Sequence, residues 1–212
     1  MSHDIFFDEA EHIYLVDGQE VPSVTTILQP LSNRAYSSVN PSVLEYARNR
    51  GAAVHEALEV YDLGGALEAT PETAPYISAY LDFCEVYRPK WTEVEQIVYD
   101  EYFGFIGTLD RVGRLNGTER AIVDLKTSQP TKEALVSVCI QTTAYTIAYD
   151  FKNFDEIKRY GLFLNKDGTY RVVDCQQYEQ KYDIDSYGAF IQLLQTRTLI
   201  DRILKTGGKG GE

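Results

Sequence analysis

The sequence predicts a mixed α/β fold (α+β) in which helices pack on a mixed central β-sheet. Three observations support this class. Helical periodicity dominates residues 41–87, three strand-like segments follow directly, and the C-terminal part returns to helix, two strands and helix. An order of helices, three strands, helix, two strands and helix implies one mixed sheet with helices packed against it.

The first forty residues are expected to form a small N-terminal decoration. Residues 5–7 and 12–16 alternate between apolar and polar as the strands of a short hairpin would. Asp17-Gly18 supplies the next turn, and Ser23 is placed to cap a helix.

Two longer helices are expected next. Between Pro41 and Leu63 apolar residues recur every three or four positions, with Pro near the start and Gly64-Gly65 past the end. The same spacing recurs over residues 71–87, where Arg88-Pro89 ends the helix because the residue before a proline avoids the helical region.

From Trp91 the pattern changes to that of strands. Three antiparallel strands are expected within WTEVEQIVYDEYF, FIGTLDRVGRL and AIVDLKTS, with turns at Gly104 and Asn116-Gly117. Helical spacing returns over residues 132–149. Strands are then expected at residues 159–164 and 170–175, around a turn at residues 166–168, and a helix over residues 183–204 closes the fold.

Length and composition favour one soluble domain over residues 1–212, with residues 1–40 as the decoration and residues 206–212 as a flexible tail. Its apolar stretches are only a few residues long, whereas a membrane helix needs roughly 20. The first ten residues also lack the pattern of a signal peptide. No membrane association is expected, and the cytoplasm is the expected location.

Cysteine usage and charge narrow the chemistry further. Cys84, Cys139 and Cys175 are odd in number and widely separated, which supports neither a disulfide framework nor a cysteine metal site, so buried thiols are expected. The net charge of −12 argues against indiscriminate binding of polyanions. It is compatible with a metal site, because carboxylates that hold a cation count here as negative charge.

The segment GTLDRVGRLNGTERAIVDLKTS carries the candidate chemistry. Asp124 and Lys126 share one face of a strand because side chains alternate, while Leu125 points to the other face. A hairpin brings Asp110 to meet them. Two carboxylates about 4 Å apart would repel by something like 4 kcal/mol at an effective dielectric near 20, and a divalent cation relieves this repulsion. Such oxygen ligands favour Mg²⁺ or Mn²⁺.

These residues resemble the PD-(D/E)XK nuclease superfamily, and more narrowly its RecB-type branch. Gly-Thr-Leu-Asp110, then Ile-Val-Asp124-Leu-Lys126 after a hairpin, matches the core motif. Counterparts of three further elements lie in the same order: Arg50-Gly-Ala-Ala-Val-His55 on an upstream helix, Val94-Glu95 on the preceding strand, and Gln141-Thr-Thr-Ala-Tyr145 on the following helix. The opening Val21-Pro-Ser-Val-Thr25 also resembles phage and recombination-associated members.

The resemblance implies a restriction-endonuclease-like core and metal-dependent hydrolysis of DNA. Asp110 and Asp124 would be metal ligands with the Leu125 carbonyl, and Lys126 would orient or help deprotonate the attacking water. Further ligands would be Glu95 and His55, with Glu93 and Glu101 as alternatives to Glu95. The residues expected to contact substrate or the Lys126 region are Arg50, Gln141 and Tyr145.

The expected function is therefore a Mg²⁺- or Mn²⁺-dependent DNA exonuclease, of phage or prophage origin, that acts in recombination or DNA processing. The motif does not separate an exonuclease from an endonuclease, and the net charge of −12 keeps a non-catalytic nucleic-acid-binding module as an alternative. By analogy with related processive exonucleases, a ring-shaped homo-oligomer or a recombination partner protein is expected. Arg48, Arg88, Lys90 and Lys132 are further candidates for a basic DNA-binding surface.

Overall fold

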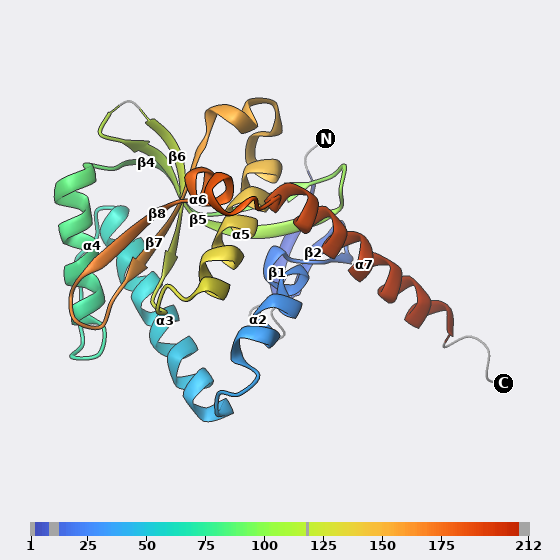
Figure 1. The fold of residues 1–212 in the computed structure, drawn as a ribbon, viewed down its shortest axis with the longest axis horizontal. Coiled ribbons are helices and arrows are strands. Elements are labelled where there is room, and N and C mark those ends of the chain that lie inside the picture. Colours follow the sequence, from blue (N-terminus) through green and yellow to red (C-terminus); the bar gives the residue numbers. More distant parts are fainter. Residues whose placement is uncertain (1–2, 9–12, 118, 208–212) are drawn as a thin grey trace.

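The computed structural model describes residues 3–8, 13–117 and 119–207, which form two sheets and their surrounding helices (Figure 1). The central sheet contains β4 (Lys90–Asp100), β5 (Phe105–Leu115), β6 (Glu119–Lys126), β7 (Lys158–Leu164) and β8 (Tyr170–Asp174), in that spatial order. Neighbouring strands pair antiparallel, except that β6 and β7 pair in parallel. The fold is therefore the expected mixed α/β arrangement.

The parallel pair needs a crossover, and α5 (Lys132–Asp150) provides it together with the short 3-10 helix η1 (Phe151–Glu156). Thr131 caps α5, because its side chain accepts a hydrogen bond from the Ala134 N–H. From this cap α5 packs across one face of the sheet. Eleven of its residues are buried, so it forms the centre of one helical layer.

Helices cover both faces of the central sheet. One face carries α1 (Val24–Ile27), α5 and α7 (Ser186–Gly207), which share a core with inward residues such as Leu109 and Ile122. The other carries α3 (Pro41–Asp62) and α4 (Ala74–Tyr87), whose Leu58 and Phe83 pack with Val123 and Leu125. Because successive residues of β6 point to opposite faces, its buried run serves both cores.

The N-terminal decoration is a three-stranded meander of β1 (Ile5–Asp8), β2 (Ile13–Val16) and β3 (Gln19–Val21), followed by α1 and α2 (Gln29–Tyr36). The Asp17-Gly18 turn and the Ser23 cap both occur as expected. The meander packs on β5, where Tyr14 and Val16 enclose Ile106. The part of the expected hairpin at His12 lies outside the described residues.

Most predicted boundaries agree with the structure, but several expectations were incomplete or wrong. The second long helix begins at Ala74, because Thr70 and Thr73 form a hydrogen-bonded turn before it. Strand β8 ends at Asp174, whose side chain instead caps the unexpected helix α6 (Cys175–Tyr182). The last helix consequently begins at Ser186, and it includes residues 206 and 207 of the expected tail. Helix α2 and η1 were also missed.

Helix α7 extends beyond the body of the molecule in its C-terminal half (Figure 1). Among the helices that the structure describes, none combines the length and apolar character needed to cross a bilayer. The three cysteines are free thiols; Cys139 and Cys175 are buried, as expected, whereas Cys84 is half-buried.

Candidate active site

The site forms where β5 and β6 part. Their ladder begins at the Leu115 and Glu119 turn and its last pair is Arg111 with Val123. Beyond that pair, the Asp110 side chain replaces a backbone carbonyl as the acceptor for β6. Its Oδ2 accepts a hydrogen bond from the Leu125 N–H at 2.6 Å. The motif aspartate on β5 is thereby fixed beside the end of β6.

Asp124 and Lys126 lie together, as the alternation of β6 predicts. Lys126 Nζ is 2.6 Å from Asp124 Oδ2, and Asp124 is only 1% exposed. Burial raises the pKa of Asp124 to about 6, although the Lys126 ammonium opposes this rise. Burial tends to lower the pKa of Lys126, but Asp124 and Asp110 more than offset this and the pKa is raised overall. Lys126 is therefore a cation at neutral pH.

His55 on α3 and Glu95 on β4 complete an acidic cluster with Asp110. His55 Nδ1 is 3.6 Å from Glu95 Oε1 and 3.8 Å from Asp110 Oδ1. One potential ligand atom from each of the three residues lies within 4.8 Å of the others. Burial disfavours the charged imidazole, yet the Asp110 and Glu95 carboxylates raise the pKa of His55 overall. Burial disfavours the charged Glu95, but His55 and Arg111 hold its pKa below the usual value.

Helix α5 supplies two side chains behind the lysine. Lys126 Nζ donates to Gln141 Oε1 at 3.0 Å, and Gln141 Nε2 donates to the Tyr145 hydroxyl at 2.9 Å. The two residues are one helical turn apart and so share a face. Burial raises the pKa of Tyr145 well above its ordinary value, so the phenol remains protonated. The Lys126 ammonium is thus held by a carboxylate on one side and an amide on the other.

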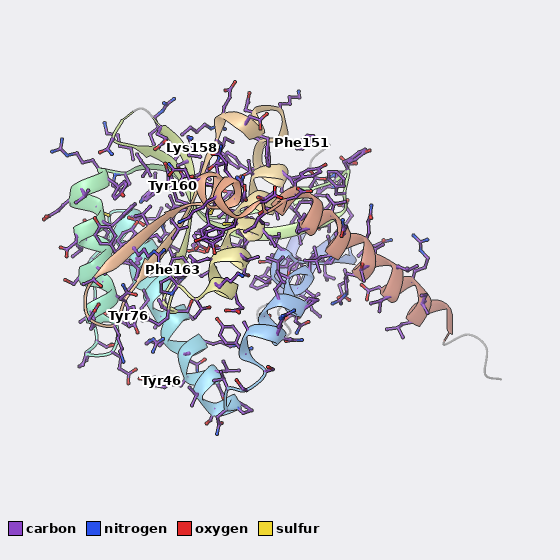
Figure 2. The ribbon with its side chains drawn as sticks, viewed as in Figure 1. Tyr46, Tyr76, Phe151, Lys158, Tyr160 and Phe163 are labelled. Atoms are coloured by element: carbon purple, nitrogen blue, oxygen red, sulfur yellow. The ribbon has the colours of Figure 1, made fainter. Side chains whose placement is uncertain are left out.

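Arg50 lies at the mouth of the site. Its guanidinium stacks over the rings of Tyr46 and Tyr76, 5.9 Å and 5.0 Å from their centroids, and its Nη2 donates to the Thr127 carbonyl at 3.5 Å. Tyr46 lies near the free end of α3 and Tyr76 near the start of α4 (Figure 2). These contacts hold a cation close to the end of β6, next to Lys126.

A cleft of about 740 Å³ is lined by most of these residues, including the three of the acidic cluster, whereas Asp124 is not among its described lining residues. Its walls come from α2, the first half of α3, the N-terminal meander and the parted ends of β5 and β6. Arg48, Arg50 and His55 line it from α3, whereas Glu95, Asp110 and Lys126 line it from the sheet. The acidic cluster and the cations therefore face the same space, open to a ligand.

This constellation of a carboxylate pair, a neighbouring lysine and a mixed sheet with the β6–α5–β7 crossover agrees with the comparison to known families. The sequence pattern of the PD-(D/E)XK nuclease superfamily matches residues 33–207. The chain belongs to this superfamily. Its members are nucleases, so membership implies hydrolysis of a phosphodiester in a nucleic-acid substrate. A search of curated proteins returned no match.

As in a PD-(D/E)XK site, the donor set fits a divalent metal. Two cations, Arg111 and Lys126, face four carboxylates, Asp62, Glu95, Asp110 and Asp124, which leaves two negative charges apart from His55. Within the described residues, Asp124 Oδ1 is buried without a hydrogen-bond donor, whereas Oδ2 contacts only the Lys126 ammonium. Oxygen ligands and unsatisfied buried carboxylate atoms are what Mg²⁺ or Mn²⁺ would satisfy.

The geometry of the site also distinguishes between the glutamates that the sequence left as alternative metal ligands. Glu95 lies beside His55, whereas Glu93 is not among the described residues that line the cleft. Glu101 lies 3.5 Å from His3 Nε2 in the turn beyond β4, away from the cluster. Among the additional basic candidates Arg48 lines the cleft; Arg88, Lys90 and Lys132 are not among its described lining residues.

Sequence reasoning missed two residues that support the candidate site. Arg111 directly follows the motif Asp110 and contacts Glu95, while Asp62 on α3 contacts Arg111. A signal for Arg111 was present, since an arginine inside the otherwise apolar strand FIGTLDRVGRL must find a buried partner. Asp62 gave no such signal, because an acidic residue at the end of a helix is ordinarily solvated.

Proposed function

We propose that this chain is a metal-dependent deoxyribonuclease that acts as an exonuclease. The observation that carries the proposal is the meeting of Asp110, Asp124 and Lys126 at the parted end of β5 and β6, with His55 and Glu95 beside them. Carboxylates that converge on one point together with an unneutralised pair of negative charges favour a Mg²⁺ or Mn²⁺ cofactor.

The ligands would be Asp110, Asp124, Glu95, His55 and the Leu125 carbonyl. The chemistry that the divalent ion supplies when bound is a lowered pKa for a water ligand and polarisation of a phosphoryl oxygen. Lys126 remains protonated because its pKa is raised, so its ammonium orients the attacking water or a phosphate oxygen. Gln141 fixes the ammonium direction, and Tyr145 fixes Gln141 through the hydroxyl that accepts its amide N–H.

The substrate would enter along the cleft that leads to these residues. Arg50 presents a guanidinium beside Lys126, and Arg48 lines the same cleft, so both can contact phosphates of the strand being cut. The cleft of about 740 Å³ confines a ligand close to the carboxylates.

The finer assignments rest on the order of motifs in the sequence. The His55, Glu95 and Gln141-to-Tyr145 elements around the core motif favour the RecB-type branch. Resemblance to phage and recombination-associated members at residues 21–25 favours phage or prophage origin and a role in recombination or DNA processing. A ring-shaped homo-oligomer or a partner protein remains part of the proposal by analogy alone.

The decisive experiment compares wild type with Asp124→Asn and Glu95→Gln on linear and circular DNA, single- and double-stranded, with Mg²⁺, Mn²⁺ or EDTA. Glu93→Gln is the matched control, because it removes a carboxylate from the same strand outside the cleft. We expect metal-dependent loss of linear DNA only, abolished by Asp124→Asn and preserved by Glu93→Gln.

Other outcomes identify other functions. Cleavage of circular DNA would make the protein an endonuclease. RNA as the only substrate cleaved would overturn the assignment to DNA. Absence of cleavage together with absence of metal binding would favour the non-catalytic binding module that the net charge of −12 also suggested.

A further inference from the structure

Arg111 is a buried arginine that contacts the site from behind. It is 0% exposed, and its side chain leaves β5 one residue after the Asp110 carboxylate. Its Nη1 donates to Glu95 Oε1 at 2.9 Å and to the Asp110 backbone carbonyl at 2.7 Å. One nitrogen therefore links β4, which carries Glu95, to the backbone of β5 at Asp110.

The other end of the guanidinium is anchored on α3. Arg111 Nε donates to Asp62 Oδ2 at 2.6 Å. The same carboxylate oxygen accepts from the Tyr80 hydroxyl at 2.7 Å, and the Trp91 indole N–H donates to Tyr80 at 2.9 Å. Asp62 Oδ2 therefore accepts from two donors, Arg111 and Tyr80, and a rotation of the carboxylate would leave both donors unsatisfied.

The contacts close a ring through α3. His55 and Asp62 are seven residues apart on this helix, which places them two turns apart on one face. His55 faces Glu95, Glu95 accepts from Arg111, and Arg111 donates to Asp62 on the same helix. Such a closed ring fixes the Glu95 carboxylate relative to the imidazole, which a single contact would not do.

The backbone of Glu95 makes this support necessary. Its φ is +48°, a region that residues other than glycine occupy only where the surroundings hold them. This left-handed conformation interrupts the regular alternation of side chains along β4, so the strand alone does not determine where the Glu95 carboxylate points. Arg111 supplies the missing constraint.

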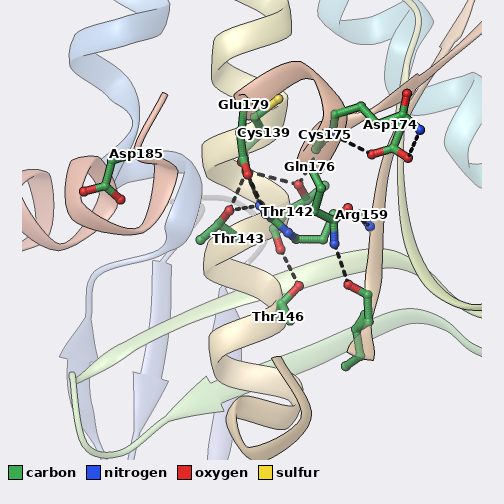
Figure 3. Close-up of polar contacts among 12 residues, drawn as sticks. Cys139, Thr142, Thr143, Thr146, Arg159, Asp174, Cys175, Gln176, Glu179 and Asp185 are labelled. Carbon is green, nitrogen blue, oxygen red and sulfur yellow. Dashed lines mark hydrogen bonds and ion pairs between the residues drawn. The ribbon is translucent and has the colours of Figure 1, made fainter. Parts of the chain in front are cut away.

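A second buried arginine provides the contrast. Arg159 on β7 forms an ion pair with Glu179 on α6 at 2.6 Å and also donates to Thr143 on α5 (Figure 3). Its partners pin α6 and α5 to the sheet, and none of them belongs to the acidic cluster. Arg159 thus has the burial and the ion pair of Arg111 without the contact to a proposed ligand.

We propose that Arg111, anchored by Asp62, is a positioning residue that holds Glu95 in the orientation needed to bind the divalent metal. The proposal rests on the proposed function, since it assumes that Glu95 is a ligand. Lysine cannot replace the arginine, because one ammonium on a flexible stem cannot serve Asp62, Glu95 and the Asp110 carbonyl in fixed directions.

The test is the affinity for Mn²⁺ alone, measured by isothermal titration calorimetry on the full chain without DNA. Arg111→Lys is expected to weaken Mn²⁺ binding by about 10–100-fold, as loss of a group that orients a metal ligand does. Asp62→Asn, which preserves the volume of the anchor, is expected to weaken it in the same direction. Arg159→Lys is the matched control and should leave the affinity unchanged.

A double-mutant cycle separates positioning from general damage. In a Glu95→Gln background, adding Arg111→Lys should weaken Mn²⁺ binding no further, because the group that Arg111 orients is already altered. An equal loss in both backgrounds would overturn the proposal. If Arg111→Lys does not fold, as judged by circular dichroism, the same cycle with Asp62→Asn decides.

The two proposals fail in different ways. Wild-type affinity in both Arg111→Lys and Asp62→Asn, in a protein whose Mn²⁺ binding is lost in Asp110→Asn, would overturn the role of Arg111 and leave the metal site intact. Absence of Mn²⁺ binding by wild type would overturn the proposed function and this inference together.

Discussion

At the scale of single residues, the site is a set of charged side chains that the fold holds close together and largely buries. Asp124 is buried beside Lys126, and one carboxylate oxygen of Asp110 already accepts a hydrogen bond from the Leu125 N–H. A buried carboxylate without full hydrogen bonding is costly unless a cation completes it. The metal-free site therefore lowers the free energy of unfolding, and metal binding should restore it.

Lys126 can be tested separately from the metal ligands. Lys126→Ala is expected to abolish DNA cleavage, a loss of at least about 100-fold, because the ammonium that orients the reacting group is removed. Mn²⁺ binding should remain mostly intact, since the carboxylates are unchanged. Cleavage rate and calorimetric affinity are measured in parallel, with Lys166→Ala in the exposed β7–β8 turn as control. Retained cleavage would remove Lys126 from the mechanism.

The raised pKa of Asp124 predicts a pH dependence of stability in EDTA. Its folded pKa, about 6, lies above the ordinary value of 3.8, so folding favours the protonated form. This contribution is complete below about pH 4 and is lost as pH rises through about 6, at an overall cost of about 3 kcal/mol. Urea denaturation from pH 4 to 7 should show wild type losing this stability relative to Asp124→Asn. Parallel pH curves for the two proteins would contradict the assignment.

At the scale of elements, the site depends on how closely α1 and α5 approach β5. Gly107, the glycine of the Gly-Thr-Leu-Asp motif, makes this approach possible. A Cβ at this position would lie 2.9 Å from Tyr145 Cε1 and 3.1 Å from Val24 Cγ2. Tyr145 is 2% exposed and bonded to Gln141, so the ring has little room to move. The motif glycine is explained by packing.

Gly107→Ala should consequently affect both stability and activity. The extra methyl group is expected to destabilise the fold by about 1–3 kcal/mol, as overpacking of a core does. It should also slow cleavage by displacing Tyr145 and with it the Gln141 contact to Lys126. Urea denaturation and the linear-DNA assay measure the two effects. Unchanged values in both assays would mean that α5 can shift without cost.

At the scale of the whole molecule, the charge distribution limits how the protein meets nucleic acid. The chain carries a net charge of −12, yet Arg48 and Arg50 line the cleft beside Lys126. Sequence-independent affinity for nucleic acid comes from cations that neutralise phosphates. A surface with few such cations in reach should bind weakly except where the metal and the cleft act together.

Salt dependence measures this directly. With Lys126→Ala as a binding-competent, inactive protein in Mg²⁺, log K against log salt for single-stranded DNA should have a slope of about −1 to −2, because two cleft arginines each contribute roughly −0.7. Arg50→Ala should reduce the magnitude of the slope by about 0.7. Fluorescence anisotropy over a range of salt concentrations gives both values. A much steeper slope would indicate a basic surface outside the cleft.

Local sequence information was sufficient for much of the fold and for the core of the site. Periodicity placed α3, α5 and the three strands β4 to β6, because each buries one consistent face. It missed α6, whose few apolar residues give no clear period, and α2, which has no buried residue. The pairing of Asp124 with Lys126 followed from strand alternation alone.

Only the tertiary structure decided which distant groups complete the site. Strand spacing left Glu93 and Glu95 as alternatives, and the left-handed backbone of Glu95 together with Arg111 brought Glu95 to His55. Asp62 entered the network because the long Arg111 side chain on β5 reaches it on α3. The sequence by itself determined the chemistry that neighbours along a strand or helix share; contacts between elements far apart in the chain depend on packing, which local periodicity does not encode.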